Sequence, residues 1–204
     1  MKYGKGDAAV VVNVATSAAL FQALRARFAK GQGFALATLN LDHLTKLPGD
    51  PGFAAAYHAQ DLIVADGRPV VWLSQLAKQP VALMPGSDLI IPLCELAAEQ
   101  SLPIAFFGSD EEALHRAAAA LRARVPGLEI CHIAAPPMGF DPESAEADTA
   151  LRNIANSGAR LCFLALGAPK QEMLAARGRE VAPGVGFASV GAGLDFLAGR
   201  QRRA

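Results

Sequence analysis

Short apolar and β-branched runs alternate along the chain with longer amphipathic stretches. Short runs bounded by glycine, proline or polar residues are typical of buried strands, whereas apolar residues that recur every three or four positions are typical of helices. Strands are predicted at Val10–Val14, Phe34–Thr38, Leu62–Ala65, Ile104–Phe107, Leu128–Ile133, Arg160–Leu166 and Gly186–Val190. Helices are predicted at Ala18–Lys30, Gly52–Ala59, Pro69–Ala77, Asp88–Gln100, Glu111–Arg124, Ser144–Asn156 and Gln171–Arg179. This alternation predicts an α/β fold with a mainly parallel sheet flanked by helices.

Proline and glycine mark most junctions, and no interdomain linker is evident, so residues 1–204 are predicted to form a single domain. The stretch rich in proline and glycine at 77–88 could divide it into two lobes. The face Ala113–Leu121 could pack in the core or across a symmetric dimer.

Composition narrows the class of protein. Nineteen basic residues balance nineteen acidic ones, so net charge gives no basis for nucleic-acid binding. The cysteines, Cys94, Cys131 and Cys162, lie far apart and fit no metal-ligand spacing, which indicates reduced thiols in a cytosolic protein. No apolar run reaches the roughly 18 residues that span a bilayer, and the start does not resemble a signal peptide. We therefore expect a cytoplasmic protein with no structural metal.

Candidate chemistry lies where predicted strands end, because ligands of open parallel sheets bind at the carboxyl ends of the strands. Five such junctions carry polar residues or glycines. They are Thr38-Leu39-Asn40 with Asp42 and His43, Ala65-Asp66-Gly67, Phe107-Gly108-Ser109-Asp110, Leu166 to Glu172, and Val190 to Asp195.

Asp66 follows an apolar strand and precedes Gly67, which would allow a ligand to approach closely. A carboxylate in this place could accept a proton from a sugar hydroxyl. It could equally cap the helix that begins near Pro69, and the pattern alone does not separate these two interpretations. Trp72, on that helix, is predicted to be a packing residue.

Gly108-Ser109-Asp110 follows a strand and opens a helix, where glycine would let a phosphate or ribose approach the backbone. A plain helix cap by Ser109 or Asp110 is the alternative, and the pattern alone favours it. The chain has neither a Walker A run nor a strand-associated G-x-G-x-x-G, which argues against ATP hydrolysis and ordinary NAD chemistry.

Two further junctions carry polar groups. Thr38 and Asn40 offer groups suited to sugar hydroxyls, with a polar turn as the alternative, and His43 is expected to be a satisfied polar residue. In the run from Gly167 to Glu172, the residue preferences of a helix N-terminus explain Pro169 and Glu172. They do not explain Lys170-Gln171.

Taken together and in order, these junctions resemble the WecG/TagA/CpsF family of glycosyltransferases. The matching segments are Thr38-Leu39-Asn40, Ala65-Asp66-Gly67 with Val71-Trp72, Pro85 to Leu89, Phe107-Gly108-Ser109, Gly139-Phe140, Leu166 to Glu172, and Gly191 to Gly199. Each segment is weak alone, but the ordered set spans most of the chain.

The resemblance implies a Rossmann-like fold and a metal-independent, inverting transfer with no cofactor. The donor would be a UDP-sugar of N-acetylmannosamine or glucose type, and the acceptor a polyprenyl-diphosphate-linked sugar at the cytoplasmic face of the membrane, in cell-surface polysaccharide or teichoic acid synthesis. By motif matching, Asp66 would be the general base. Substrate would be bound by Thr38, Asn40, Gly139, Phe140 and Gln171, and the nucleotide by Gly108, Ser109, Gly167, Lys170 and Asp195.

Two departures from the family pattern matter. Relatives carry an arginine shortly before the Pro-Gly-Ser-Asp-Leu run, where this chain has apolar Val81 to Met84, so Lys170 or another arginine would have to supply the phosphate-binding cation. Relatives also continue into a basic C-terminal membrane appendage, whereas this chain stops at Arg202-Arg203-Ala204, so we expect a shortened chain or a short form with reduced activity. Peripheral membrane contact would then involve the Arg200–Arg203 cluster.

Two alternatives to this glycosyltransferase remain open. One is a noncatalytic nucleotide-sugar-binding protein, and the other is a different nucleotide-utilising α/β enzyme. A homo-oligomer is also possible.

Overall fold

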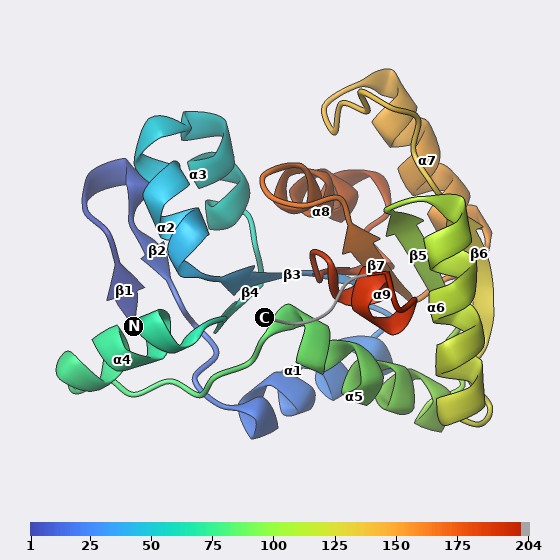
Figure 1. The fold of residues 1–204 in the computed structure, drawn as a ribbon, viewed down its shortest axis with the longest axis horizontal. Coiled ribbons are helices and arrows are strands. Elements are labelled where there is room, and N and C mark those ends of the chain that lie inside the picture. The colour runs from blue at the N-terminus through green and yellow to red at the C-terminus, as the bar shows by residue number, and fades with distance from the viewer. Residues whose placement is uncertain (201–204) are drawn as a thin grey trace.

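A computed structural model describes residues 1–200 and contains one sheet of six parallel strands in the order β4-β3-β8-β7-β5-β6 (Figure 1). The strands are β3 (Phe34–Leu39), β4 (Leu62–Ala65), β5 (Ile104–Gly108), β6 (Ile130–Ala134), β7 (Leu161–Ala165) and β8 (Gly186–Ser189). The prediction of a Rossmann-like α/β fold with a parallel sheet is confirmed.

One predicted strand does not join this sheet. In place of Val10–Val14, the structure has β2 (Val10–Val11), which pairs antiparallel with β1 (Lys2–Tyr3) in a separate two-stranded sheet. Beyond β2, the backbone N–H of Val14 donates to the carbonyl of Ile63, a single bond at the edge of β4. The β-branched residues predicted an extended backbone correctly, but pairing with the N-terminus decided their sheet.

The helices lie at or near their predicted positions, and two short ones were not predicted. They are α1 (Ser17–Ala29), α2 (Leu41–Lys46), α3 (Pro51–His58), α4 (Arg68–Leu76), α5 (Gly86–Glu99), α6 (Glu111–Arg124), α7 (Ala145–Asn156), α8 (Lys170–Val181) and α9 (Gly193–Leu197), with 3-10 turns η1 (Gly6–Ala8) and η2 (Leu47–Gly49). The unpredicted helices are α2 and α9. Side-chain oxygens of Thr16, Asn40, Asp50, Asp110 and Ser144 cap the helices that follow them.

Two layers of helices cover the sheet. Apolar side chains of α1, α5, α6 and α9 form the core against one face, while α7 and α8 pack against the other with α3 beside them (Figure 1). The apolar face of α6 from Ala113 to Leu121 is fully buried, so it packs in the core, the first of its two predicted placements.

At the amino edge of the sheet, Asp61 fastens several elements together. Its carboxylate accepts hydrogen bonds from Arg27 on α1, Arg179 on α8 and the backbone N–H of Ala35 on β3. Charge-assisted bonds of this kind hold the strands in register at the edge that the candidate site does not use.

The segment 77–88 links α4 to α5. Within it Leu83 forms an isolated parallel bridge with Ala65, and the N–H of Met84 donates to the carbonyl of Ala65 at 2.8 Å. This segment thus runs beside the end of β4. The division of the domain into two lobes stays a prediction.

Candidate functional site

The carboxyl ends of β3, β4, β5, β7 and β8 lie at one edge of the sheet because all the strands run in the same direction. The helices that follow the neighbouring strands β5 and β7 diverge, since α6 packs on one face and α8 on the other. Open α/β sheets bind ligands at the strand ends where the following helices diverge in this way.

Asp66 is not the N-cap residue of α4. That position is held by Gly67, which has no side chain to cap the helix. Instead Oδ2 of Asp66 lies 3.4 Å from the backbone N–H of Gly86, in the first turn of α5. The positive end of a helix attracts a carboxylate, so the α5 N-terminus holds Asp66 at the edge of the site. The N-cap of α4 is therefore Gly67 and not Asp66, and the role of Asp66 as a base stays a prediction.

Thr38 and Asn40 lie beside Asp66, because β3 pairs with β4 up to Leu39 and Ala65. Asn40 uses Oδ1 to cap α2 through the N–H of His43, so the polar-turn interpretation accounts for that atom. Thr38 is buried, and its carbonyl accepts a bond from the Tyr57 hydroxyl at 3.1 Å.

Behind this strand end, Nδ1 of His43 lies 2.6 Å from the hydroxyl of Tyr57. Burial lowers the pKa of His43 to about 4, so its ring is neutral at pH 7, and burial raises the pKa of Tyr57 well above its usual value. His43 is therefore a satisfied polar residue, as predicted, and its contact with Tyr57 supports the strand end at Thr38.

Ser109 and Asp110 have different roles, although the sequence pattern alone could not tell which of them caps the helix. Asp110 caps α6 by accepting from the N–H of Ala113, whereas the hydroxyl of Ser109 donates to Oδ1 of Asp195 on α9 at 2.5 Å. Gly108 makes this turn possible, since a Cβ on Gly108 would lie 2.4 Å from the carbonyl oxygen of Ala165. The structure thus brings Gly108, Ser109 and Asp195 together.

A cation also lies at this end of the site. Arg200 pairs with the carboxylate of Asp110, and the two residues line a cavity of about 550 Å³ together with Ser109 and Asp195. Residues 201–203 of the predicted basic cluster lie outside the described residues.

Gln171 connects two loops of the site. Its Oε1 accepts from the N–H of Gly191 at 3.0 Å, and its Nε2 donates to Oε1 of Glu172 at 2.8 Å. Glu172 is fully buried, and desolvation raises its pKa to about 7. Sequence reasoning assigned Glu172 only to the helix dipole, so its role behind Gln171 was missed.

Lys170 holds the loop after β6. Its Nζ donates to the carbonyl of Phe140 at 2.7 Å, which brings Gly139 and Phe140 to the start of α8, close to Gly167. The ring of Phe140 is buried and packs edge-on against the ring of Phe107, with the two ring centroids 5.4 Å apart. The side chain of Phe140 is thus a core residue, and only the backbone of this loop faces the α8 N-terminus.

The end of the site at Asp66 and the end at Ser109 are joined by the first turn of α5. A Cβ on Gly86 would lie 3.2 Å from Cα of Val190, and a Cβ on Gly193 would lie 3.1 Å from Cα of Ser87. The α5 N-terminus therefore packs directly on the loop between β8 and α9. Contacts run without a gap from Asp66 through this loop to Asp195 and Ser109.

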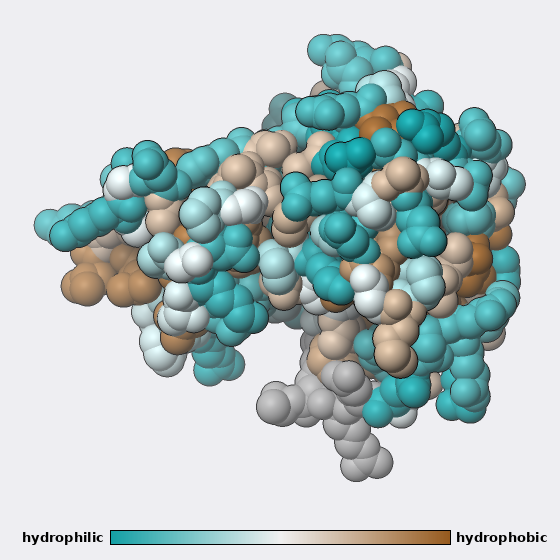
Figure 2. All heavy atoms as spheres, turned by 90° about the horizontal axis from the view of Figure 1, so that it is seen from above, coloured by the Kyte–Doolittle hydropathy of each residue, from teal (hydrophilic) through white to brown (hydrophobic). Residues whose placement is uncertain are grey.

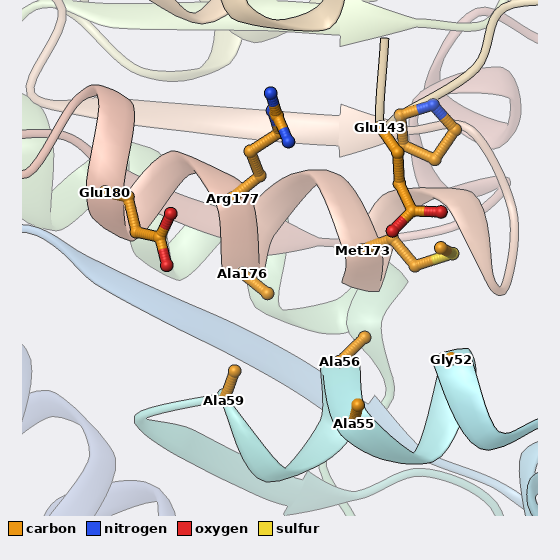
Figure 3. Close-up of a pocket in the computed structure, with 10 residues that line it drawn as sticks. Gly52, Ala55, Ala56, Ala59, Glu143, Met173, Ala176, Arg177 and Glu180 are labelled. Carbon is orange, nitrogen blue, oxygen red and sulfur yellow. The ribbon is translucent and has the colours of Figure 1, made fainter.

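A second groove, of about 300 Å³, lies between α3 and α8 and leads away from this edge (Figure 3). Small side chains line much of it, and its Arg177 forms an ion pair with Asp148 at 2.5 Å. None of the predicted site residues lines this groove. Its lining is Gly52, Ala55, Ala56, Ala59, Pro142, Glu143, Met173, Ala176, Arg177 and Glu180.

Two side-chain predictions have clear outcomes. Trp72 is 61% exposed, so the prediction that it is a packing residue is wrong: the buried residues of α4 are Val70 and Ser74. The cysteines are free, and burial raises the pKa of Cys162 above its usual range, as expected of an inert thiol. Within the described part of the chain, no cluster of three or more potential metal ligands is found.

A family model for the glycosyl transferase WecG/TagA/CpsF family matches residues 8–204, nearly the whole chain. The protein belongs to this family. It is therefore a glycosyltransferase of cell-surface polysaccharide synthesis. The WecG/TagA/CpsF match covers every junction described above, and none of the helices within residues 1–200 has the length and apolar character required to cross a bilayer.

Proposed function

We propose that this WecG/TagA/CpsF glycosyltransferase transfers a hexosyl residue, of N-acetylmannosamine or glucose type, from a UDP-sugar to a polyprenyl-diphosphate-linked sugar, with Asp66 as the general base. The observation that carries the proposal is the position of Asp66. Its carboxylate stands at the carboxyl end of β4, and its Oδ2 accepts from the backbone N–H of Gly86 at the α5 N-terminus.

The proposed reaction is a single displacement. Asp66 accepts the proton of the acceptor hydroxyl as the oxygen attacks the anomeric carbon of the donor. The new glycosidic bond forms on the face opposite the leaving group, and the bond to the UDP oxygen breaks with its electron pair leaving on UDP. This geometry inverts the anomeric centre. A general base in this role contributes about 10²- to 10⁴-fold to the rate.

The nucleotide would bind on the other side of the α5 N-terminus. A carboxylate beside a hydroxyl suits the ribose hydroxyls, and Ser109 and Asp195 form such a pair. The diphosphate would lie toward Lys170, which stands at the start of α8, and toward backbone N–H groups at the mouth of the loops, including that of Gly167. Arg200 offers a second cation for this charge. No metal is part of this proposal.

Thr38, Asn40 and the loop Gly139-Phe140 would border the sugars, and Gln171 would hold the Gly191 loop against them. The lipid-linked acceptor would place the reaction at a membrane surface, which we take to be the cytoplasmic face, and the protein would attach there peripherally.

The test is calorimetric titration of UDP, with GDP and NAD as controls, followed by transfer assays of wild type and Asp66→Asn. Glu129→Gln is the matched carboxylate control, since Glu129 is exposed and lies just before β6 at the opposite edge of the sheet. Selective UDP binding with transfer lost only in Asp66→Asn supports the proposal. UDP binding without turnover in wild type would indicate a noncatalytic nucleotide-sugar-binding protein, and equal binding of GDP or NAD would indicate another nucleotide-utilising enzyme.

A further inference from the structure

Helix α4 exposes an apolar face. Trp72 is 61% exposed and Leu76 is 82% exposed, and Leu73 on the same helix and Leu83 after it are also exposed. Figure 2 shows apolar surface gathered at the end of the molecule where α4 lies in Figure 1. Large apolar side chains exposed together, rather than singly, mark a surface that contacts another apolar phase.

The charges around this face are mostly positive. The stretch 67–85 contains Arg68 and Lys78 and no aspartate or glutamate. The neighbouring strand β1 lies against α4, because the Tyr3 hydroxyl donates to the carbonyl of Val70 at 2.8 Å. In the seven residues around that strand, two lysines outnumber one aspartate. Exposed apolar residues with a tryptophan, bordered by cations, are the pattern of a helix that lies in a membrane interface.

The apolar surface is continuous with the catalytic edge. Helix α4 begins two residues after Asp66, and Leu83 pairs with Ala65, the residue before it. On the adjacent strand end, Leu41 is exposed directly after Asn40. Any membrane or protein surface that contacts the exposed apolar face of α4 would therefore lie next to Asp66.

A second copy of this chain is a less suitable partner for the apolar face of α4 than a lipid surface. A two-fold contact across α4 would place Arg68 and Lys78 of one copy near the same cations of the other, without a carboxylate in the stretch to offset them. Anionic headgroups complement these charges, and the acyl boundary accepts the apolar side chains.

We propose that α4 is the membrane-contacting helix, with Trp72, Leu73 and Leu76 seated at the headgroup boundary of an anionic bilayer so that Asp66 faces a lipid-linked acceptor. The proposal rests on the proposed function for the acceptor, but the membrane contact itself needs no turnover.

Trp72 is the single tryptophan of the chain, so its fluorescence reports on α4 alone. The full chain is titrated with vesicles of phosphatidylcholine alone and of phosphatidylcholine with phosphatidylglycerol. We expect the emission to shift to shorter wavelength, and the protein to co-sediment, with the anionic vesicles. The variant L73S/L76S keeps the fluorophore and should bind them roughly tenfold less tightly. Met138→Ser, an exposed apolar residue after β6 at the far edge of the sheet, is the matched control and should bind as wild type.

Three outcomes would overturn the proposal. One is an unchanged emission with anionic vesicles. Another is loss of vesicle binding in R202A/R203A but not in L73S/L76S, which would assign the contact to the C-terminus. The third is a vesicle-independent emission shift that tracks dimerisation in sedimentation.

Transfer assays separate this proposal from the proposed function. L73S/L76S should lose transfer to a polyprenyl acceptor in vesicles but keep transfer to a short-chain, water-soluble acceptor, whereas Asp66→Asn should bind vesicles and lose both. Loss of both transfers in L73S/L76S would mean that α4 shapes the catalytic site and does not contact the membrane.

Discussion

The hydroxyl of Ser109 donates to Oδ1 of Asp195 across 2.5 Å and so joins the loop after β5 to the first turn of α9. These two residues lie 86 positions apart in the chain. A carboxylate can accept several hydrogen bonds, so Asp195 can hold a ribose hydroxyl while it keeps its bond to Ser109.

Replacing Ser109 with alanine should weaken binding of uridine and of UDP by the same factor. Without Ser109, Asp195 loses the bond that orients it toward the ribose, and loss of a ligand hydrogen bond to a charged group corresponds to roughly tenfold in affinity. Calorimetric titration of both ligands measures it, with Thr149→Ala as the control because the exposed hydroxyl of Thr149 bonds only to its own helix, at Ala145. A loss for UDP without a loss for uridine would remove Ser109 from the ribose site.

Lys170→Gln should weaken binding of UDP but leave uridine binding unchanged, because a cation at the α8 N-terminus acts on the diphosphate. The same titrations test this prediction. Lys30→Gln, at the exposed C-terminus of α1, serves as the charge control. If uridine binding fell equally, Lys170 would act only by holding the loop through the carbonyl of Phe140.

Glu172→Gln should change the pH dependence of stability. Burial raises the pKa of Glu172 from 4.5 to about 7, so the folded state keeps the proton where the unfolded chain has lost it. The stabilising contribution is therefore complete below pH 4.5 and is lost as the pH rises through about 7, a change of about 3 kcal/mol. Glutamine stays neutral and can still accept the bond from Gln171.

Urea unfolding between about pH 5 and pH 8 measures this effect. The free energy of unfolding of Glu172→Gln should rise relative to wild type as the pH rises. His43, with its lowered pKa, contributes in the opposite direction, but it is present in both proteins and cancels in the difference. Parallel pH profiles for the two proteins would show that Glu172 is ionised in the folded state.

Gly108→Ala should destabilise the protein by at least ~3 kcal/mol and weaken UDP binding. A Cβ there would lie 2.4 Å from the backbone oxygen of Ala165, at a φ of +127°. Gly127→Ala is the matched control, since its φ is +79° but nothing lies within 4 Å of the added atom. It should cost only about 1 kcal/mol. Equal free energies of unfolding for the two variants would show that the Gly108 loop relaxes freely.

Much of the site could be predicted because its residues follow strands. Parallel strands bring their carboxyl ends to one edge, so the sequence predicts that Asp66, Ser109 and Asp195 lie at that edge. Local pattern could not decide whether Asp66 caps α4, because capping depends on backbone geometry at Gly67. The contact of Asp66 with Gly86 joins residues 20 apart and has no local signal.

Other features depend on burial that a single sequence does not reveal. Glu172 has the residue type of a surface helix start, yet α8 packs it inside the molecule beside Gln60, whose Nε2 donates to the Glu172 carbonyl. Trp72 has the residue type of a core, yet it faces outward because α4 buries Val70 and Ser74 instead. Long-range packing overrode the local preference in both cases.

The most direct test of the account is the rate of sugar transfer by Asp66→Asn measured beside its affinity for UDP. The account predicts that transfer falls by about 10²- to 10⁴-fold while UDP affinity stays within a factor of about two. Transfer by Asp66→Asn within tenfold of wild type would show that another group takes the proton, and would contradict the assignment of Asp66 as the general base.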